Sequence, residues 1–276
     1  MHNLICVIGL AVLVSACGGG AEGTMDATQL PTATNGGGTK QGYVDLMGGA
    51  ASRIGLANFY VDGMPRADAH ATNQSCHFSS SGLCQINDCT AMPGSASYDY
   101  GPLAGAGTIT ATVGAQSLVM PRNSAGSYQT SVEGFFWNDG DPVSVSASGS
   151  GDGVPAFTAT VMAPPEFVIR APVVGDSYKV ELPNRSAIPI EWDPGAGDVE
   201  VELVAGSPLD HSVTAICKGS FSSGSLTLPA EAIAALPAGD ADVLVIRSSV
   251  VKVAAGDWQV AVSAITSAML TLTVPN

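Results

Sequence analysis

The chain has 276 residues, and its 10 Lys and Arg against 24 Asp and Glu give a formal charge of -14 at pH 7. A nucleic-acid-binding surface needs clustered cations to contact phosphates, so this composition excludes nucleic acid as a partner. Charged residues make up 12% of the chain, against roughly 25% in ordinary soluble domains. Such low charge, combined with abundant Gly, Ala, Ser, Thr and Val, is typical of secreted β-proteins.

The chain opens with an apolar segment from Leu4 to Val14, which is followed by Ser15-Ala16-Cys17. A transmembrane helix needs about 20 apolar residues, so this shorter segment predicts a signal peptide. Small residues directly before a cysteine resemble the lipobox of bacterial lipoproteins, in which that cysteine is diacylated on sulfur, released by cleavage and acylated on nitrogen. The resemblance implies a signal peptide over residues 1–16 and a palmitate-type lipid on Cys17. The alternative is a plain secretory signal, and the segment Met1-His2-Asn3 departs from the family because it has no Lys or Arg.

The lipobox resemblance also implies a location. Each buried methylene contributes about 0.8 kcal/mol, so the three acyl chains of that family hold a protein on a membrane permanently. Gly18 stands where enterobacterial lipoproteins retained in the inner membrane carry Asp, which favours the outer membrane, on its periplasmic or its external face. Residues 17–42 are rich in Gly and Thr and predict a flexible tether of about 25 residues.

The remaining cysteines are interpreted by compartment. Cys6 leaves with the signal peptide and Cys17 carries lipid. An oxidising environment predicts two disulfides among the other four, in any of three pairings. Three of them lie in one short segment, so at least one must pair with the distant fourth if all are oxidised. The four candidates are Cys76, Cys84, Cys89 and Cys217.

A zinc site is the alternative for these cysteines, because His77 adjoins Cys76 and His70 is near. The spacings do not match the paired C-x2-C knuckles of structural zinc sites. We therefore expect disulfides and no metal, and we expect His70, His77 and His211 to be surface or structural residues.

Residues 43–163 predict an N-terminal β-rich domain that contains the cysteine cluster. Residues 107–113 alternate apolar side chains with threonines, which is typical of a strand with one buried face. Similar patterns predict strands at 53–61, 128–136, 143–147 and 156–162, separated by turn residues. No long helical pattern occurs in this half.

Aromatic side chains gather at two places in this half. In a strand, Phe135 and Trp137 share one face, so an exposed binding patch is one interpretation and core packing is the default. The candidate binding aromatics are Phe135, Trp137, Tyr98 and Tyr100.

Carboxylates gather at Asp139 and Asp141, with Asp152 as a further candidate. Oxygen ligands on a turn could hold Ca2+, but the alternating D-x-D-x-D-G loop with its distal Glu is missing. We expect a polar hairpin turn here, with Ca2+ as a weak alternative, and we predict no cofactor.

The pair Pro164-Pro165 predicts a domain boundary, since prolines stiffen the backbone and remove donors. Residues 166–276 then predict a C-terminal sandwich with strands at 188–192 and 199–203 and a short helix at 229–235. Residues 258–274 alternate throughout, which leaves open one bent strand or two.

Several short strands with an early Trp192 resemble immunoglobulin-like or fibronectin-like sandwiches. With the lipobox, the glycine-rich tether and the Pro-Pro hinge, the chain resembles uncharacterised lipoproteins of myxobacteria and their relatives. The predicted fold class is therefore all-β, with two tandem β-sandwiches after a signal peptide and tether.

Motifs for catalysis are missing from the sequence. There is no G-x-S-x-G, no C-x-x-C and no phosphate-binding loop. We therefore expect a non-catalytic envelope lipoprotein with a structural or interaction role, bound to the membrane by its anchor and to an envelope protein or polysaccharide partner. The alternatives are a carbohydrate- or calcium-dependent adhesion module, and a hydrolase of extracellular polymers that uses Asp139 and Asp141.

Overall fold

The computed structural model describes residues 40–48, 52–61, 74–91, 103–133, 137–151, 153–173, 178–206 and 211–276. These residues form β-strands and two short helices, η1 (Phe221–Ser223) and α2 (Ala230–Ala235), so the all-β prediction is confirmed. The predicted signal peptide, Cys17 and most of the tether lie outside the described residues. Within the described ranges, no helix has the length and apolar character to cross a membrane.

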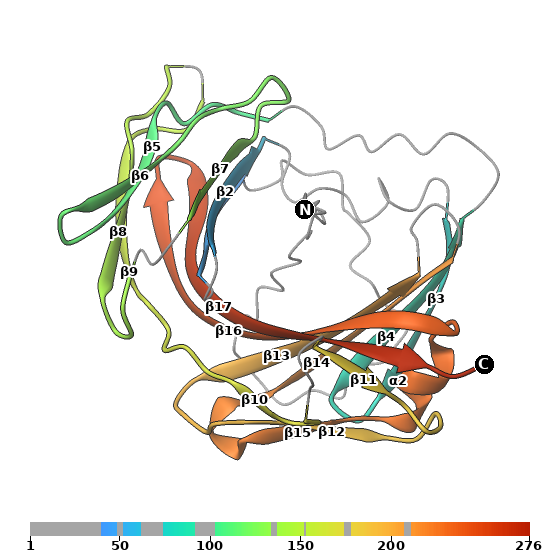
Figure 1. Ribbon diagram of the computed structural model, residues 1–276. Helices are drawn as coiled ribbons and strands as arrows, with labels where there is room; N and C mark the ends of the chain where they lie inside the picture. Colours follow the sequence, from blue (N-terminus) through green and yellow to red (C-terminus); the bar gives the residue numbers. More distant parts are fainter. Residues whose placement is uncertain are drawn as a thin grey trace, which may run out of the picture. The chain divides into compact units, whose positions relative to one another are not determined.

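The strands form three sheets (Figure 1). The large sheet has the order β3-β4-β14-β13-β16-β17-β1-β2-β7, and β11 also pairs with β17. Its strands are β1 (Lys40–Gly48), β2 (Ser52–Tyr60), β3 (Gln74–Ser81), β4 (Cys84–Ala91), β7 (Tyr128–Glu133), β11 (Lys179–Glu181), β13 (Asp198–Gly206), β14 (His211–Ser220), β16 (Gly239–Ala255) and β17 (Trp258–Val274).

Two small sheets complete the set. The four-stranded sheet has the order β6-β5-β8-β9, and the three-stranded sheet has the order β10-β12-β15. Their strands are β5 (Ile109–Val113), β6 (Gln116–Met120), β8 (Pro142–Ala147), β9 (Phe157–Met162), β10 (Ile169–Ala171), β12 (Ile188–Trp192) and β15 (Ser225–Leu228).

The first hydrophobic core lies between the four-stranded sheet and the β7, β2, β1 side of the large sheet. Phe59 is fully buried there and contacts three aromatic rings at centroid distances of 6.0 to 6.3 Å. The three partners are Tyr128, Phe157 and Trp258. Inward-facing residues of the alternating strands supply the rest, as periodicity predicts.

The second core lies between the three-stranded sheet with α2 and the β14, β13, β16, β17 side of the large sheet. Three strands facing four give this part the sandwich arrangement that the sequence predicts. Trp192 is 2% exposed, and its Nε1 donates to the Phe221 carbonyl over 3.0 Å.

The hairpin of β16 and β17 reaches both cores. Each strand has 17 residues, and their register is unbroken from Gly239 opposite Val274 to Ala255 opposite Trp258. Residues 258–274 are therefore one strand. Such a strand extends about 55 Å, more than one sandwich needs. Trp258 packs in the first core and Leu272 in the second.

The N-terminal half likewise contributes strands to the second sandwich, because its hairpin β3–β4 pairs with β14 from the C-terminal half. The expected partition into residues 43–163 and 166–276 follows the order of the chain, whereas each half lends strands to the other half's sandwich. β1 begins at Lys40, inside the range expected to be tether, and pairs parallel with β17. An added Cβ at Gly42 would lie 2.4 Å from the Phe59 ring, so glycine makes room for the core there.

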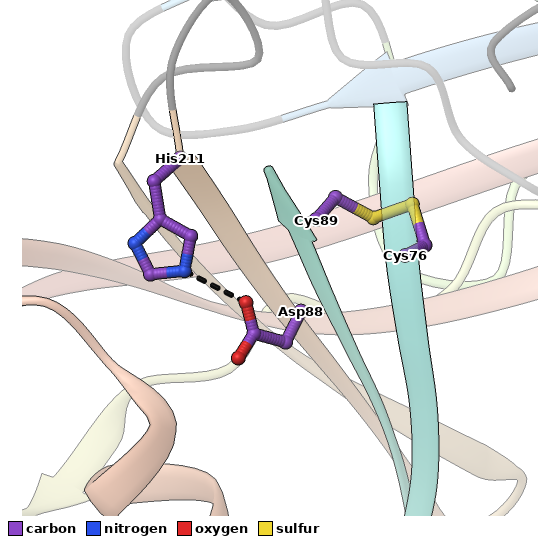
Figure 2. The surroundings of a disulfide bond; sticks show 4 residues. All are labelled: Cys76, Asp88, Cys89 and His211. Carbon is purple, nitrogen blue, oxygen red and sulfur yellow. Dashed lines mark hydrogen bonds and ion pairs between the residues drawn. A yellow bond between two sulfur atoms is a disulfide. The ribbon is translucent and has the colours of Figure 1, made fainter. Parts of the chain in front are cut away.

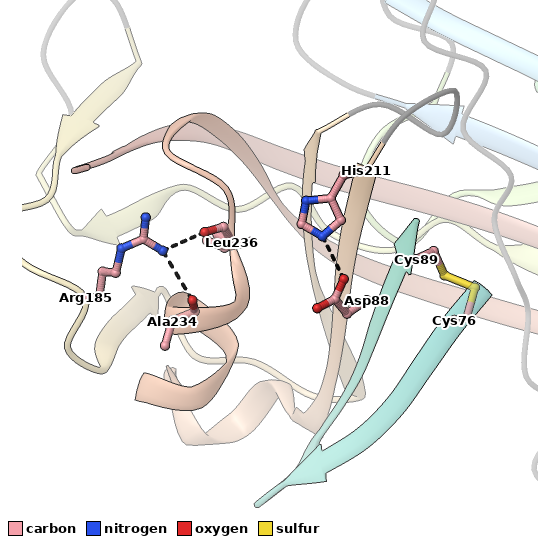
Figure 3. Close-up of polar contacts among 7 residues, drawn as sticks. All are labelled: Cys76, Asp88, Cys89, Arg185, His211, Ala234 and Leu236. Carbon is pink, nitrogen blue, oxygen red and sulfur yellow. Dashed lines mark hydrogen bonds and ion pairs between the residues drawn. A yellow bond between two sulfur atoms is a disulfide. The ribbon is translucent and has the colours of Figure 1, made fainter. Parts of the chain in front are cut away.

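Helix α2 falls where the sequence predicts it, between Pro229 and Pro237. The guanidinium of Arg185 closes its C-terminal end (Figure 3) by donating to the carbonyls of Ala234 at 3.2 Å and Leu236 at 2.6 Å. A cation at this end of a helix also offsets the partial negative charge of the unpaired carbonyls.

Candidate functional site

A groove of about 470 Å³ opens at one end of the second sandwich. Five short pieces of chain form it: the β3–β4 turn, the end of β14, η1, β15 and the start of α2. Glycine permits the tight turn, because Gly82 has a φ of 58°. The residues that line the groove are Ser81, Gly82, Leu83, Gly219, Ser220, Ser223, Ser225, Leu226, Thr227 and Pro229.

Aromatic packing fixes the floor beneath this groove. Phe221 of η1 is 1% exposed and stacks on Trp192 at a centroid distance of 5.6 Å. The Arg247 guanidinium lies 4.4 Å from the same ring, and Phe167 meets its edge at 5.1 Å. The ring therefore packs against three side chains, and this fixes the course of residues 221–223.

Covalent and hydrogen bonds fix the wall of the groove. The disulfide between Cys84 and Cys217 is buried and joins β4 to β14 directly below the turn. The Lys218 amide donates to the Leu83 carbonyl at 3.2 Å, and Ser81 Oγ donates to Glu231 Oε2 at 3.1 Å. The turn is thus tied to β14 on one side and to α2 on the other.

Hydroxyl groups dominate the polar lining, and none of the lining residues carries a titratable side chain. Ser223 Oγ lies 2.8 Å from the Ser220 carbonyl and 2.7 Å from the Ser225 carbonyl, either of which can accept its single proton, and this contact shapes the η1 turn. The Glu231 carboxylate that accepts the hydrogen bond from Ser81 lies outside the lining and is exposed. The groove can exchange hydrogen bonds with an uncharged, hydroxyl-bearing ligand, while Leu83, which is 69% exposed, offers apolar contact.

The predicted disulfides are confirmed, and the structure chooses the pairing that sequence left open. Cys76 pairs with Cys89 inside the β3–β4 hairpin, and Cys84 pairs with Cys217. Because all four sulfurs are bonded in pairs, no thiolate remains for the zinc alternative, which is wrong for these cysteines. No group of three or more His, Cys, Asp or Glu side chains within the described ranges could hold a metal ion.

Figure 2 shows one side-chain hydrogen bond, between His211 and Asp88, beside the Cys76–Cys89 bond. His211 Nε2 of β14 lies 2.7 Å from Asp88 Oδ1 of β4, and both side chains are partly exposed. This contact adds a side-chain link between two strands that already share a backbone ladder. His77 is exposed on β3, and His70 lies outside the described residues.

Of the four candidate binding aromatics, the structure describes Trp137 alone. Trp137 is 4% exposed and belongs to the first core, so the core interpretation holds and Trp137 offers no binding face. Tyr98, Tyr100 and Phe135 lie outside the described residues.

The carboxylate candidates serve the turn before β8. Asp141 Oδ2 accepts hydrogen bonds from the backbone amide of Asn138 at 2.8 Å and from its side-chain amide at 3.1 Å. Asp139 Oδ1 accepts from the Glu166 amide at 2.9 Å. These bonds match the polar hairpin turn that we expect, and Asp152 lies outside the described residues.

The sequence interpretation did not include Asp45, a half-buried carboxylate. Asp45 on β1 lies beside Ser263 on β17, whose hydroxyl donates to Asp45 Oδ1. Burial raises the pKa of the Asp45 carboxyl above its ordinary value, and the Ser263 hydrogen bond opposes that rise in part. The pKa of Tyr43, on the same face of β1, is also raised by burial and then by the charge of Asp45.

The groove itself also escaped sequence reasoning, because its lining comes from residues 81–83 and 219–229 and carries no motif. The available signal was the cluster Ser220-Phe221-Ser222-Ser223-Gly224-Ser225 next to Cys217. A serine cluster alone equally predicts a solvated turn, so only the three-dimensional structure identifies the groove.

No protein-family profile and no curated protein sequence matches this chain. Among solved structures, the chain is similar to the FN1–FN3 domains of chicken CNTN1, with 12% identity and a TM-score of 0.23 over 74% of this chain and 67% of that one. It is similar to a 1.5-MDa bacterial ice-binding adhesin, with 15% identity and a TM-score of 0.21 over 71% and 59%. It is also similar to a Ca2+-stabilised adhesin that helps an Antarctic bacterium bind ice, with 15% identity and a TM-score of 0.21 over 69% of this chain and 44% of that one. The chain thus spans less than two thirds of either adhesin structure, and TM-scores this low establish no shared function.

Proposed function

We propose that this protein is a non-catalytic lipoprotein of the bacterial outer membrane, anchored through Cys17, that binds an uncharged envelope saccharide in the groove between the β3–β4 turn and β15. The observation that carries this proposal is a groove whose lining combines serine and threonine hydroxyls with apolar side chains and includes no charged residue.

Location is supported by two independent features. The lipobox resemblance at residues 14–17 predicts the anchor, and the two disulfides belong to an oxidising compartment. A chain of formal charge -14 would repel acidic polymers, so a neutral partner suits it better than an anionic one.

Ligand class is supported by the chemistry of the lining. Serine and threonine hydroxyls both donate and accept, which matches the hydroxyls of a sugar ring. Specific sites usually combine a few placed polar groups with apolar contact, and Leu83, Leu226 and Pro229 provide that contact here. The fixed floor and wall reduce the entropy that binding would otherwise cost.

The proposal is tested by titrating the full chain, solubilised in detergent, with neutral oligosaccharides from the envelope in a calorimeter. The variant Ser225→Ala/Thr227→Val removes two exposed hydroxyls of β15 and should weaken binding about tenfold or more, since each hydrogen bond contributes about 1 kcal/mol. The matched control is Thr158→Val, which removes an exposed hydroxyl from β9 and should leave binding unchanged. Absence of heat with every neutral saccharide, or equal binding by the β15 variant, would overturn the proposal.

A further inference from the structure

β3 is the terminal strand of the large sheet and bonds to β4 on one side only. Within the described ranges, no strand pairs with its outer edge. The opposite end of the sheet is different, because β7 is partly covered: the Gln129 amide donates to the Pro121 carbonyl at 3.3 Å, and Arg122 forms a bridge with Tyr128. Among the described residues, β3 is thus the end of the large sheet whose outer edge has no partner strand or bridge, and it lies at the margin of the sheet in Figure 1.

This edge lacks the usual protection against pairing. Proteins commonly block an edge strand with Lys, Pro, other charges or a bulge. β3 reads Gln-Ser-Cys-His-Phe-Ser-Ser-Ser, without Lys, Arg, Asp, Glu or Pro, and its register with β4 is unbroken over eight residues. Phe78 is 55% exposed. The strand thus presents a row of backbone groups that no bulge interrupts and no charged side chain protects.

The disulfides reveal which backbone groups face outward. Cys76 and Cys89 are opposite each other with Cα atoms 4.1 Å apart, and Cys84 and Cys217 are 3.9 Å apart. In antiparallel pairs, the closer spacing marks the pairs that exchange no backbone hydrogen bonds. The N–H and C=O of Cys76 therefore point away from β4, as do those of Phe78 and Ser80 by alternation.

Backbone ladders and disulfides, more than core packing, hold this hairpin in place. Among the side chains that the structure describes, which leave out Gln74 and Ala91, β3 contributes none to either core and β4 contributes Cys84 and Ile86. One disulfide fixes β3 on β4 and the other fixes β4 on β14. The open edge is consequently held in one position although few apolar contacts stabilise it.

We propose that β3 pairs antiparallel with β3 of a second copy of this chain, around a two-fold axis through His77. Charge favours this surface, because two chains of formal charge -14 repel one another, whereas β3 carries no acidic residue. Hydrogen-bonding geometry then fixes the register, since outward-facing residues must lie opposite outward-facing residues. Centring on His77 gives the largest number of backbone bonds, about eight across the two-fold.

Side chains agree with this register. Cys76 of one copy lies opposite Phe78 of the other, so the exposed ring covers the partly exposed Cys76–Cys89 disulfide of its neighbour. His77 lies opposite His77 of the second copy, and Ser75 lies opposite Ser79 of the second copy. A single strand edge buries less than a standard interface of about 1,600 Å², so the dimer should be weak and dependent on concentration.

Cysteine cross-linking of the full chain tests this register. His77→Cys places one thiol directly opposite its own copy in a close pair, where a disulfide fits. Under mild oxidation it should give a dimer on non-reducing gels, with a 77–77 linkage in peptide mass spectrometry. Ser75→Cys and Ser79→Cys are matched controls, because each alone faces serine; neither should cross-link alone, and a mixture of the two should.

Proline supplies the second arm of the test. Ser80→Pro removes an outward N–H that makes no bond to β4, so the hairpin and its Cys76–Cys89 linkage should persist while the His77→Cys dimer is lost. Three results would overturn the proposal: a His77→Cys dimer no stronger than that of Ser75→Cys, a dimer that survives Ser80→Pro with the linkage intact, or cross-linking of His77→Cys to a different protein.

Discussion

Cys84 of β4 and Cys217 of β14 lie directly opposite each other, with Cα atoms 3.9 Å apart, although 133 residues separate them in sequence. Their bond joins a hairpin from the N-terminal half to a strand of the C-terminal half. Both cysteines are buried in the second core, next to the groove. The bond thus links the two halves of the chain at the place where the candidate site is built.

Removing this bond should destabilise the protein more than removing its neighbour. In the loop-entropy account, stabilisation grows with the length of the closed loop, from about 3 kcal/mol near 15 residues to about 4.7 kcal/mol near 100. The separations here are 133 and 13 residues. We expect Cys84→Ala/Cys217→Ala to lose more unfolding free energy in urea than Cys76→Ala/Cys89→Ala. Equal losses, or the reverse order, would contradict the role assigned to the longer link.

Two buried tryptophans should respond differently to replacement by phenylalanine. Trp192 Nε1 donates to the Phe221 carbonyl at 3.0 Å, whereas Trp258 Nε1 is buried without a hydrogen-bond partner in the described part of the structure. Trp192→Phe removes the shortest of three hydrogen bonds to the Phe221 carbonyl, which also accepts from the amides of Gly224 at 3.3 Å and Gly195 at 3.4 Å. Trp258→Phe instead removes an unpaired donor. We expect Trp192→Phe to cost about 1 kcal/mol more in chemical denaturation. A larger loss for Trp258→Phe would show that this comparison is wrong.

Asp45 should make stability depend on pH. Burial raises its pKa in the folded state, so the folded protein binds this proton more tightly than the unfolded chain does. The stability linked to that proton is fully present below the unfolded pKa and is lost as pH rises through the folded pKa. Asp45→Asn should therefore raise the urea midpoint at neutral pH, and the gain should disappear at acid pH.

The matched control for Asp45 is Asp193, whose pKa is lowered mainly by the hydrogen bond from Arg170. A lowered pKa means that the charged form of Asp193 is the one that stabilises the folded protein, so Asp193→Asn should not raise the urea midpoint at neutral pH. Stabilisation by both substitutions to the same extent would point to a general charge effect in this acidic chain, and would refute the local explanation for Asp45.

Sequence reasoning found the strands whose two faces differ. Residues 109–113, 188–192 and 199–203 alternate because one face packs in a core and the other meets solvent. β1 escaped because Gly42 and Gly48 interrupt the apolar pattern, although both face the first core and make room for large rings. β3 was missed because it is held by its ladder with β4 and by a disulfide while most of its side chains are exposed, so its sequence has no hydrophobic period.

Architecture was harder to predict than the strands. Periodicity shows that residues 258–274 alternate, but it cannot show that one strand serves two cores. The candidate groove was hidden for a related reason, since Ser81 and Thr227 meet only when β4 pairs with β14. Long-range pairing of this kind is specified by tertiary packing, whereas periodicity reports local exposure.

Metabolic labelling with palmitate tests the central claim, that this is a lipid-anchored envelope protein, most directly. The full chain and its Cys17→Ser variant would be expressed in a bacterium with lipoprotein-processing enzymes and recovered from membranes. The account predicts label on the wild-type chain, none on Cys17→Ser, and release of Cys17→Ser from the membrane fraction. Equal labelling of both chains, or no label on the wild type, would contradict it.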